Sequence, residues 1–200
     1  MITHLLYLHG FRSSPQSMKA RKMAAWVAAH RPDLHWWCPQ LPPSPAEAMA
    51  LLRTGVADWP QASSAVIGSS LGGFYATVLA EALGWRSVLL NPAVHPARDL
   101  ARYIGEQTAW HDPAERFFFR PAFIAELTLL EPAQLVQPER HYAVIAQGDE
   151  VLNWCEMHAR YAPCRVKLLA GSDHALSDFD DHLADIVRFL DLTTTRSDPG

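Results

Sequence analysis

The sequence predicts an α/β protein with a mostly parallel six-stranded sheet, helices on both faces and a small helical insert. Short apolar runs alternate with longer helical segments, as in proteins whose strands are joined by crossover helices. The runs are apolar throughout rather than at every second position, which indicates strands covered on both faces. The expected strands are Leu5–Leu8, His35–Cys38, Ala65–Ile67, Ser87–Leu90, Tyr142–Ala146 and Val166–Leu169.

The length and the charge of the chain indicate one ordinary domain. Two hundred residues can bury a continuous core, and 49% of them are hydrophobic while 19% are charged. The net charge of −4 comes from 17 basic and 21 acidic residues without a basic stripe, so we expect neither nucleic acid nor a membrane as partner. We assign one domain to residues 1–192 and a polar tail to residues 193–200.

The first residues and the cysteines indicate a cytoplasmic protein. The opening MITHLLYLHG has no basic region, and its apolar run is too short for a signal peptide or a membrane span. The three cysteines are an odd number without a CxxC spacing. This pattern fits free thiols in a reducing compartment better than a disulfide framework.

The helices expected between the strands show start signals and helical periodicity. Ser44 is expected to cap the helix after the proline-rich loop 38–45, with Pro45 in the first turn. The last helix has apolar residues at helical spacing and aspartates on the opposite face. Its expected buried face consists of Phe179, Leu183, Ile186, Val187 and Leu190.

One connection, from Asn91 to Glu139, is far longer than an ordinary link between strands. Two segments in it, 95–110 and 122–132, are expected to be helical and are joined by the aromatic run Phe117–Phe119. We interpret about 92–138 as a small cap or lid. The alternative is one ordinary crossover helix with long flanks.

The stretch VIGSSLGGF, residues 66–74, has the pattern of a nucleophile on a sharp strand-to-helix turn. Such a turn presses together the residues two before and two after the nucleophile, so both must be small. Ser70 is flanked in this way by two glycines, whereas Ser69 is flanked by Ile67 and Leu71. Ser70 is therefore the candidate nucleophile. The alternative is a glycine-rich loop that merely closes a strand–helix connection; a P-loop is excluded because no Lys-Ser/Thr follows the glycines.

A serine nucleophile needs a histidine as base and an acid that orients the histidine. His174 lies at the end of the last strand, and Asp149 follows the strand before it, which gives the chain order serine, acid, histidine expected after such a turn. Asp149 could instead be a turn or helix-capping residue. Glu150 is expected to point elsewhere, and Asp173 to shape its own loop.

Two backbone N–H groups are expected to form an oxyanion hole. One belongs to Leu71, directly after the candidate nucleophile. The other belongs to Phe11, in the loop LYLHGFRSSP after the first strand, where Gly10 lets the backbone turn toward the site. His9 is expected to fix this loop by hydrogen bonding. Four strand ends thus carry HGF, GSSLGG, GDE and SDHA in the order typical of an α/β-hydrolase.

The motifs LLYLHGFRSSPQSMKA, VIGSSLGGFYAT, QGDEVLNW and GSDHALSDFDDHLADIVRFL resemble those of the YqiA-like esterases, compact bacterial α/β-hydrolases. The resemblance extends from Leu5 to about Leu190. It implies a cytoplasmic, cofactor-free hydrolase of short-chain esters or acyl thioesters with a trimmed sheet. It carries over Ser70 as nucleophile, Asp149 as acid and His174 as base.

The main hypothesis is therefore a serine esterase that acts on a small-molecule ester through an acyl-serine intermediate. The alternatives are an acyl-CoA thioesterase and a non-enzymatic binding protein on the same scaffold. No G-x-G-x-x-G follows the first strand and no HExxH occurs, so we expect neither a nucleotide cofactor nor a catalytic metal. Most other histidines are expected to be solvated or capping; they include His30, His35, His95, His111, His141, His158 and His182.

Overall fold

The computed structural model describes residues 1–110, 112 and 114–193, and within them six strands form one parallel sheet. The predicted fold class is confirmed. His111 and the tail beyond residue 193 lie outside the described residues. The strands of the sheet are β1 (His4–Leu8), β2 (His35–Trp37), β3 (Ser64–Ser69), β4 (Arg86–Leu90), β7 (His141–Ala146) and β8 (Arg165–Leu169).

The order of the strands, β2-β1-β3-β4-β7-β8, places a change of direction between β1 and β3. From β1 the chain moves outward to β2, then returns to the other side of β1 and builds the rest of the sheet in sequence. In open parallel sheets, the carboxyl ends of the strands around such a point frame the ligand site. The loops after β1 and β3 meet there.

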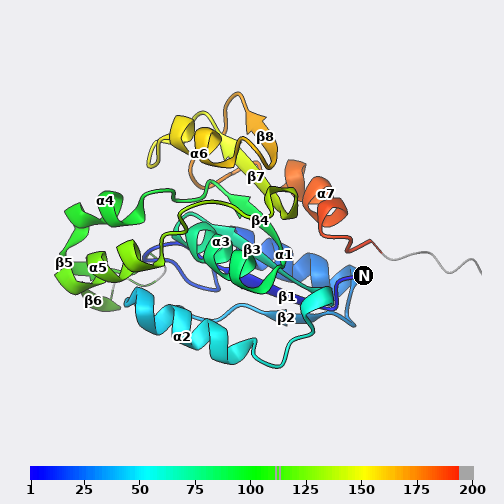
Figure 1. Ribbon diagram of the computed structural model, residues 1–200, viewed down its shortest axis with the longest axis horizontal. Coiled ribbons are helices and arrows are strands. Elements are labelled where there is room, and N and C mark those ends of the chain that lie inside the picture. Colours follow the sequence, from blue (N-terminus) through cyan, green and yellow to red (C-terminus); the bar gives the residue numbers. More distant parts are fainter. Residues whose placement is uncertain (111, 113, 194–200) are drawn as a thin grey trace, which may run out of the picture.

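Helices cover both faces of the sheet, as Figure 1 shows. On one face, α1 (Met18–His30) and α7 (Asp180–Phe189) bury residues such as Met23 and Ile186. On the other face, α2 (Pro45–Gly55), α3 (Leu71–Leu83) and α6 (Trp154–Tyr161) bury residues such as Leu52, Leu79 and Met157. Two apolar layers therefore hold the strand ends in fixed positions. Among the described residues, no helix combines the length and the apolar character needed to cross a bilayer.

The start of α2 follows the predicted capping signal. The Ser44 hydroxyl accepts a hydrogen bond from the Glu47 N–H at 3.2 Å, and Pro45 is the first helical residue. The helix α6 begins at Trp154, where the side chain of Asn153 caps it by accepting from the Cys155 N–H. The residues between β7 and α6 are thereby left as a loop.

The connection between β4 and β7 forms a cap that contains a β-hairpin as well as helices (Figure 1). The prediction of a helix over 95–110 is wrong in its second half, because Gly105 has a φ of 125° and the chain continues as a strand. The aromatic run lies in the partner strand. The cap comprises α4 (Pro96–Leu100), η2 (Ala101–Tyr103), β5 (Gly105–Thr108), β6 (Arg116–Phe119) and α5 (Pro121–Leu130); the short turns η1 (Gln61–Ser63) and η3 (Pro138–Arg140) precede β3 and β7.

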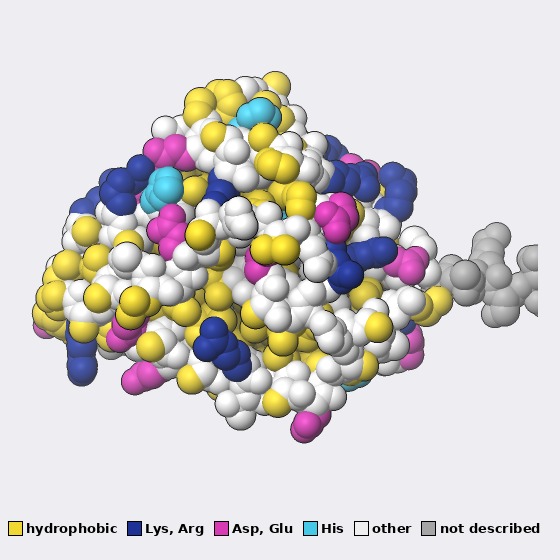
Figure 2. Space-filling view, in the orientation of Figure 1, with side chains coloured by type: hydrophobic (Ala, Val, Ile, Leu, Met, Phe, Trp, Pro, Cys, Tyr) yellow, Lys and Arg dark blue, Asp and Glu magenta, His cyan; other side chains and the backbone are white. Residues whose placement is uncertain are grey.

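The cap has one buried and one exposed apolar side. Phe119 and Leu127 are 1% and 0% exposed and join the core layer of α2 and α3. In contrast, Trp110 and Leu129 are 71% and 86% exposed. Figure 2 shows hydrophobic side chains gathered on the end of the molecule that these cap elements occupy. The cap is thus anchored to the domain by its inner side chains.

A buried polar chain crosses the opposite end of the sheet, where β4 and β7 begin. His141 is 1% exposed; one ring nitrogen lies 2.7 Å from the Ser87 hydroxyl and the other 2.6 Å from a carboxylate oxygen of Glu81. His182, 6% exposed, lies 3.2 Å from Asp178. These two buried histidines are exceptions to the expectation that most of the remaining histidines are solvated or capping.

Candidate active site

Ser70 occupies a strained bend between β3 and α3. Its φ of 56° and ψ of −121° lie outside the regions that non-glycine residues ordinarily adopt. The flanking glycines make the bend possible: a Cβ on Gly68 would lie 2.2 Å from the Gly72 oxygen, and one on Gly72 would lie 2.1 Å from the Leu8 oxygen. The local sequence therefore places the Ser70 side chain at the carboxyl edge of the sheet. Ser69, the last residue of β3, is buried.

Ser70, His174 and Asp149 form one hydrogen-bonded chain, although they are far apart in the sequence. The Ser70 Oγ lies 3.1 Å from His174 Nε2, and His174 Nδ1 lies 2.7 Å from Asp149 Oδ2. The nitrogen that faces the carboxylate carries the proton, so Nε2 is left to accept from the serine hydroxyl. The three side chains have the order and spacing that nucleophilic serine chemistry requires.

Asp149 is held in place by its own turn. Its side chain is fully buried, and Oδ1 accepts the N–H groups of Val151 and Leu152, both at 2.8 Å. The other oxygen is thereby left for His174. Asp149 therefore has both of the roles considered for it. Its Oδ1 stabilises the turn, and its Oδ2 contacts His174.

The loop that carries His174 is tethered by three side chains that the sequence did not single out for this purpose. The Asn91 side chain donates to the oxygens of Asp173 and His174 at 2.9 and 3.2 Å. The Lys19 ammonium donates to the Ala175 oxygen at 2.5 Å. Glu150 accepts the His174 N–H at 3.0 Å, so the expectation that Glu150 points elsewhere is wrong.

Of these three tethers, only Asn91 carries a weak sequence signal. Asn91 follows β4 directly and adopts a φ of 42°, a conformation that asparagine tolerates better than most residues. Its oxygen also accepts the Ala146 N–H at 2.8 Å, which joins the end of β7 to the histidine loop. Asp173 shapes its own loop as expected, by accepting the Ser177 N–H and hydroxyl at 2.9 and 2.6 Å.

Lys19 is an unusual charge at this site because only 8% of it is exposed. Burial lowers the pKa of its ammonium to about 8, although the carboxylates of Asp173 and Asp149 act in the opposite direction. A buried ammonium is disfavoured by the loss of water around it. The protonation state of the Lys19 amine therefore affects its contact with the loop that holds His174.

Two amide groups beside Ser70 are available to bind an oxyanion. Neither the Phe11 N–H nor the Leu71 N–H donates a hydrogen bond within the described part of the chain. Gly10 brings the first loop against the serine, since a Cβ there would lie 3.1 Å from the Ser70 Cβ. The start of α3 adds the positive end of a helix dipole. The predicted donors thus flank the nucleophile candidate.

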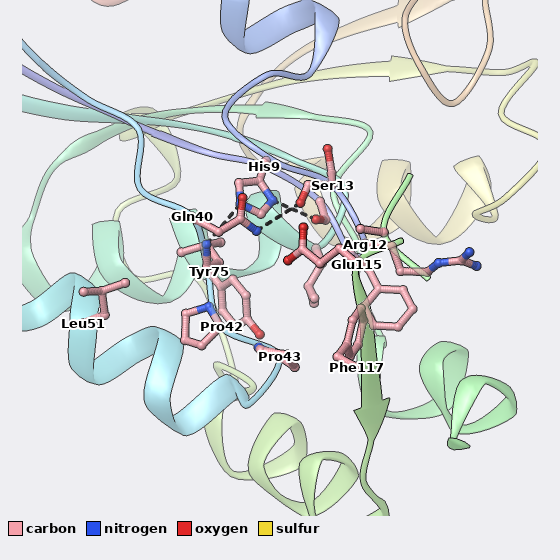
Figure 3. Close-up of a pocket in the computed structure, with 15 residues that line it drawn as sticks. His9, Arg12, Ser13, Gln40, Pro42, Pro43, Leu51, Tyr75, Glu115 and Phe117 are labelled. Atoms are coloured by element: carbon pink, nitrogen blue, oxygen red, sulfur yellow. Dashed lines mark hydrogen bonds between the residues drawn. The ribbon is translucent and has the colours of Figure 1, made fainter. Parts of the chain in front are cut away.

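His9 fixes the loop after β1, residues 9–13, which is the candidate oxyanion loop. Its Nδ1 donates to the Gly10 oxygen at 3.0 Å, and its Nε2 accepts the Leu41 N–H at 3.1 Å (Figure 3). The ring is 3% exposed. His9 therefore ties the loop after β1 to the proline-rich loop after β2, as the sequence predicted.

A cavity of about 680 Å³ opens over Ser70 and His174. Its volume lies in the range of sites that bind small organic molecules. The sheet supplies its floor and the cap supplies apolar side chains, among them Leu100, Tyr103 and Trp110. Ser70 is half-buried at this cavity, so its hydroxyl is reachable for a small molecule.

Arg12 joins the cap to the oxyanion loop. Its Nε donates to the Thr108 oxygen at 2.6 Å, and its backbone oxygen accepts the Trp110 N–H at 2.7 Å. Its guanidinium also lies over the Trp110 ring, 4.1 Å from the centroid. One residue therefore connects the cap hairpin to the loop that holds Phe11.

Several solved structures share the fold of this chain. The mouse alpha/beta hydrolase domain-containing protein 10 is 15% identical, with 94% of this chain and 90% of that chain covered and a TM-score of 0.70. Est1E from Butyrivibrio proteoclasticus is 12% identical, with 96% and 87% covered and a TM-score of 0.66. An esterase from Pyrococcus furiosus is 14% identical, with 95% and 80% covered and a TM-score of 0.61. The architecture is that of the α/β-hydrolases.

The family assignment comes from the sequence itself. The model of the uncharacterised protein family UPF0227 matches residues 4–191, nearly the whole of the described chain. The matched segment includes every residue of the candidate site, from the loop after β1 to the loop after β8. This chain therefore belongs to UPF0227, the YqiA family that its sequence motifs resemble.

Proposed function

We propose that this protein is a serine hydrolase that cleaves short-chain carboxylic esters through an acyl-Ser70 intermediate. The observation that carries the proposal is the unbroken chain from Ser70 Oγ to His174 to the buried Asp149, at 3.1 and 2.7 Å, on a bend strained to expose the hydroxyl. The α/β-hydrolase fold, shared with a structure described as a Pyrococcus furiosus esterase, supports the same reaction class.

In the acylation step, Ser70 Oγ attacks the ester carbonyl while His174 Nε2 takes the hydroxyl proton. The imidazolium that forms is stabilised by Asp149, and the carbonyl oxygen gains its negative charge beside the N–H groups of Phe11 and Leu71. His174 then gives its proton to the leaving alcohol. The carbon–oxygen bond breaks, and the acyl group stays on Ser70.

In the deacylation step, a water molecule takes the place of the alcohol. His174 Nε2 removes a proton from the water as it attacks the acyl carbonyl, and the same proton returns to Ser70 Oγ when the acid leaves. The enzyme is restored with no cofactor consumed.

Oxygen esters fit the site better than coenzyme A thioesters, because two of the three Lys and Arg side chains that line the larger cavity are engaged internally, and a single arginine, Arg102, remains. Arg12 donates to Thr108 and Lys19 donates to Ala175, so neither is arranged to bind the coenzyme's phosphates. The two reactions are compared by measuring kcat/KM for p-nitrophenyl butyrate and for butyryl-coenzyme A. A higher kcat/KM for the coenzyme A thioester would favour the thioesterase instead.

The direct test combines a fluorophosphonate probe with p-nitrophenyl butyrate hydrolysis. Mass spectrometry should find the probe on Ser70, and Ser70→Ala should lower kcat by about 10⁴-fold or more. Ser69→Ala is the matched control, because Ser69 is the neighbouring buried spacer. Folded protein that neither reacts with the probe nor hydrolyses esters would instead support the non-enzymatic binding protein.

A further inference from the structure

A second cavity, of about 460 Å³, lies on the far side of the oxyanion loop from His174. It is framed by the loop after β1, the loop after β2, α2, α3 and the cap hairpin. The two cavities share the wall made by His9–Ser13 and Leu71, but Ser70 and His174 line only the larger one. Gly10 belongs to this wall and lies against Ser70, so the second cavity begins one residue away from the hydroxyl.

The chemistry of the Ser70–His174–Asp149 chain gives the two cavities different roles. His174 Nε2 must hand its proton to the leaving oxygen, so the alcohol has to lie on the His174 side, in the larger cavity. The carbonyl oxygen points to the amides of Phe11 and Leu71. The remaining substituent of the reacting carbon, the acyl chain, is directed away from His174 and along the wall toward the second cavity.

The lining of the second cavity is mostly apolar, with a polar group inside it. The apolar part consists of Phe11, Leu41, Pro42, Pro43, Leu51, Leu71, Ala109 and Phe117. Arg12 and Glu115 carry opposite charges, which favours a neutral occupant over an anion or a cation.

Tyr75 supplies the polar group. It is 2% exposed, and its hydroxyl has no hydrogen-bond partner among the described residues. In Figure 3 its ring projects from α3 into the space framed by Leu51, Pro43 and Phe117. Burial and, to a lesser degree, the Glu126 carboxylate raise its pKa, so the hydroxyl keeps its proton and can both donate and accept. The hydroxyl retains contact with the cavity, where a ligand oxygen can hydrogen-bond to it.

We infer that the second cavity binds the acyl group of the substrate, and that this group is apolar near the ester and carries a neutral hydrogen-bonding oxygen at its far end. The inference rests on the proposed ester hydrolysis. Hydroxyaryl and hydroxyalkyl acyl groups belong to this class.

Two variants change the volume of the second cavity in opposite directions. Leu51→Trp adds bulk at its rim, and Phe117→Ala removes a ring from its wall; neither residue lines the larger cavity. With p-nitrophenyl esters, the ratio of kcat/KM for hexanoate to that for acetate should fall about tenfold in Leu51→Trp and rise in Phe117→Ala. Val151→Trp, in the wall of the larger cavity only, is the matched control. It should change the preference among butyrate esters of different alcohols instead.

Tyr75→Phe tests the polar end of the acyl group. The wild-type protein should prefer the p-nitrophenyl ester of 3-(4-hydroxyphenyl)propanoate over that of 3-phenylpropanoate, and Tyr75→Phe should reduce this preference about fivefold, as expected for one hydrogen bond. Unchanged acyl ratios in both volume variants, or a change in the alcohol ratios alone, would overturn the inference. That result would leave the proposed function standing as long as the fluorophosphonate still reacts with Ser70. Loss of both ester hydrolysis and fluorophosphonate labelling in folded wild-type protein would overturn the proposed function itself.

Discussion

The side chain of Asn91 holds the backbone of His174 from the end of β4, with its amide nitrogen 3.2 Å from the His174 oxygen. The same nitrogen lies 2.9 Å from the Asp173 oxygen, and Asn91 is completely buried. Three strand ends therefore converge on one amide, because its oxygen also accepts from Ala146 of β7. The position of the imidazole depends on this residue, although Asn91 does not touch the reacting atoms.

Asn91→Ala should lower kcat by roughly 10- to 100-fold with little change in KM, because the imidazole loses its alignment while the cavity walls remain. The measurement is steady-state kinetics on p-nitrophenyl butyrate, with the rate of fluorophosphonate labelling as a second readout. A purely structural role predicts a lower melting temperature with unchanged kcat in the folded fraction, and that outcome would contradict the prediction.

Lys19→Met should remove a pH dependence of stability. The folded pKa is about 8 and the ordinary value is 10.5, so between these values the unfolded chain binds a proton that the folded chain does not. The free energy of unfolding of the wild type therefore rises with pH in this window, by about 3 kcal/mol from this group. The contribution is complete above pH 10.5 and is lost as the pH falls to 8.

The measurement is urea unfolding of wild type and Lys19→Met at several pH values from 7 to 10.5. Other groups, including tyrosines and cysteines with raised pKa values, titrate in both proteins and cancel in the difference. The difference in the free energy of unfolding should change steadily from pH 8 upward. If the free energies of unfolding of the two proteins run parallel from pH 8 to pH 10.5, the pKa of Lys19 has its ordinary value and the prediction fails.

Gly72→Ala should destabilise the protein by several kcal/mol, because the added Cβ would lie 2.1 Å from the Leu8 oxygen and α3 would have to move away from β1. Gly171→Ala is the control, since a Cβ there meets no atom within 4 Å; it should change stability by less than about 0.5 kcal/mol. Thermal unfolding compares the two. Equal melting temperatures would mean that the bend at Ser70 does not need its flanking glycine.

Glu81→Gln should lower the free energy of unfolding by about 2 kcal/mol while leaving kcat/KM unchanged. The variant weakens the buried contact with His141 at the end of the sheet opposite to Ser70. Chemical denaturation and ester hydrolysis measure the two quantities on one preparation. A loss of activity in fully folded protein would show that the two ends of the sheet are coupled.

The protein contains two serine–histidine–carboxylate chains, one at Ser70 and one formed by Ser87, His141 and Glu81. Only the first could be predicted from the sequence. Ser70 was recognisable because the constraint is local: two glycines at fixed spacing, a strand before and a helix after. Ser87 has no such neighbours, and its contact with His141 depends on the register between β4 and β7, which pairs them across 54 residues. Burial separates the two chains, since Ser87 is 0% exposed and can meet no substrate.

The Lys19 and Glu150 tethers of the histidine loop could not be predicted either, because they too join residues that are far apart in the sequence. Lys19 reaches Ala175 across 156 residues, and its place on α1 gives no hint of that contact. Likewise, the aromatic run in the cap suited either a helix or a strand, and pairing of β6 with β5 decided between them. Strand ends and the six-stranded sheet were predictable because each follows from a short stretch of sequence.

The Arg12 contacts with Thr108 and Trp110 have a practical consequence for engineering. Replacing the cap with one from a relative, in order to widen the choice of substrates, would also remove the support of the backbone that presents Phe11. Such a chimera would be expected to lose turnover even on its original substrate. A transplanted cap should therefore bring a partner for Arg12 with it.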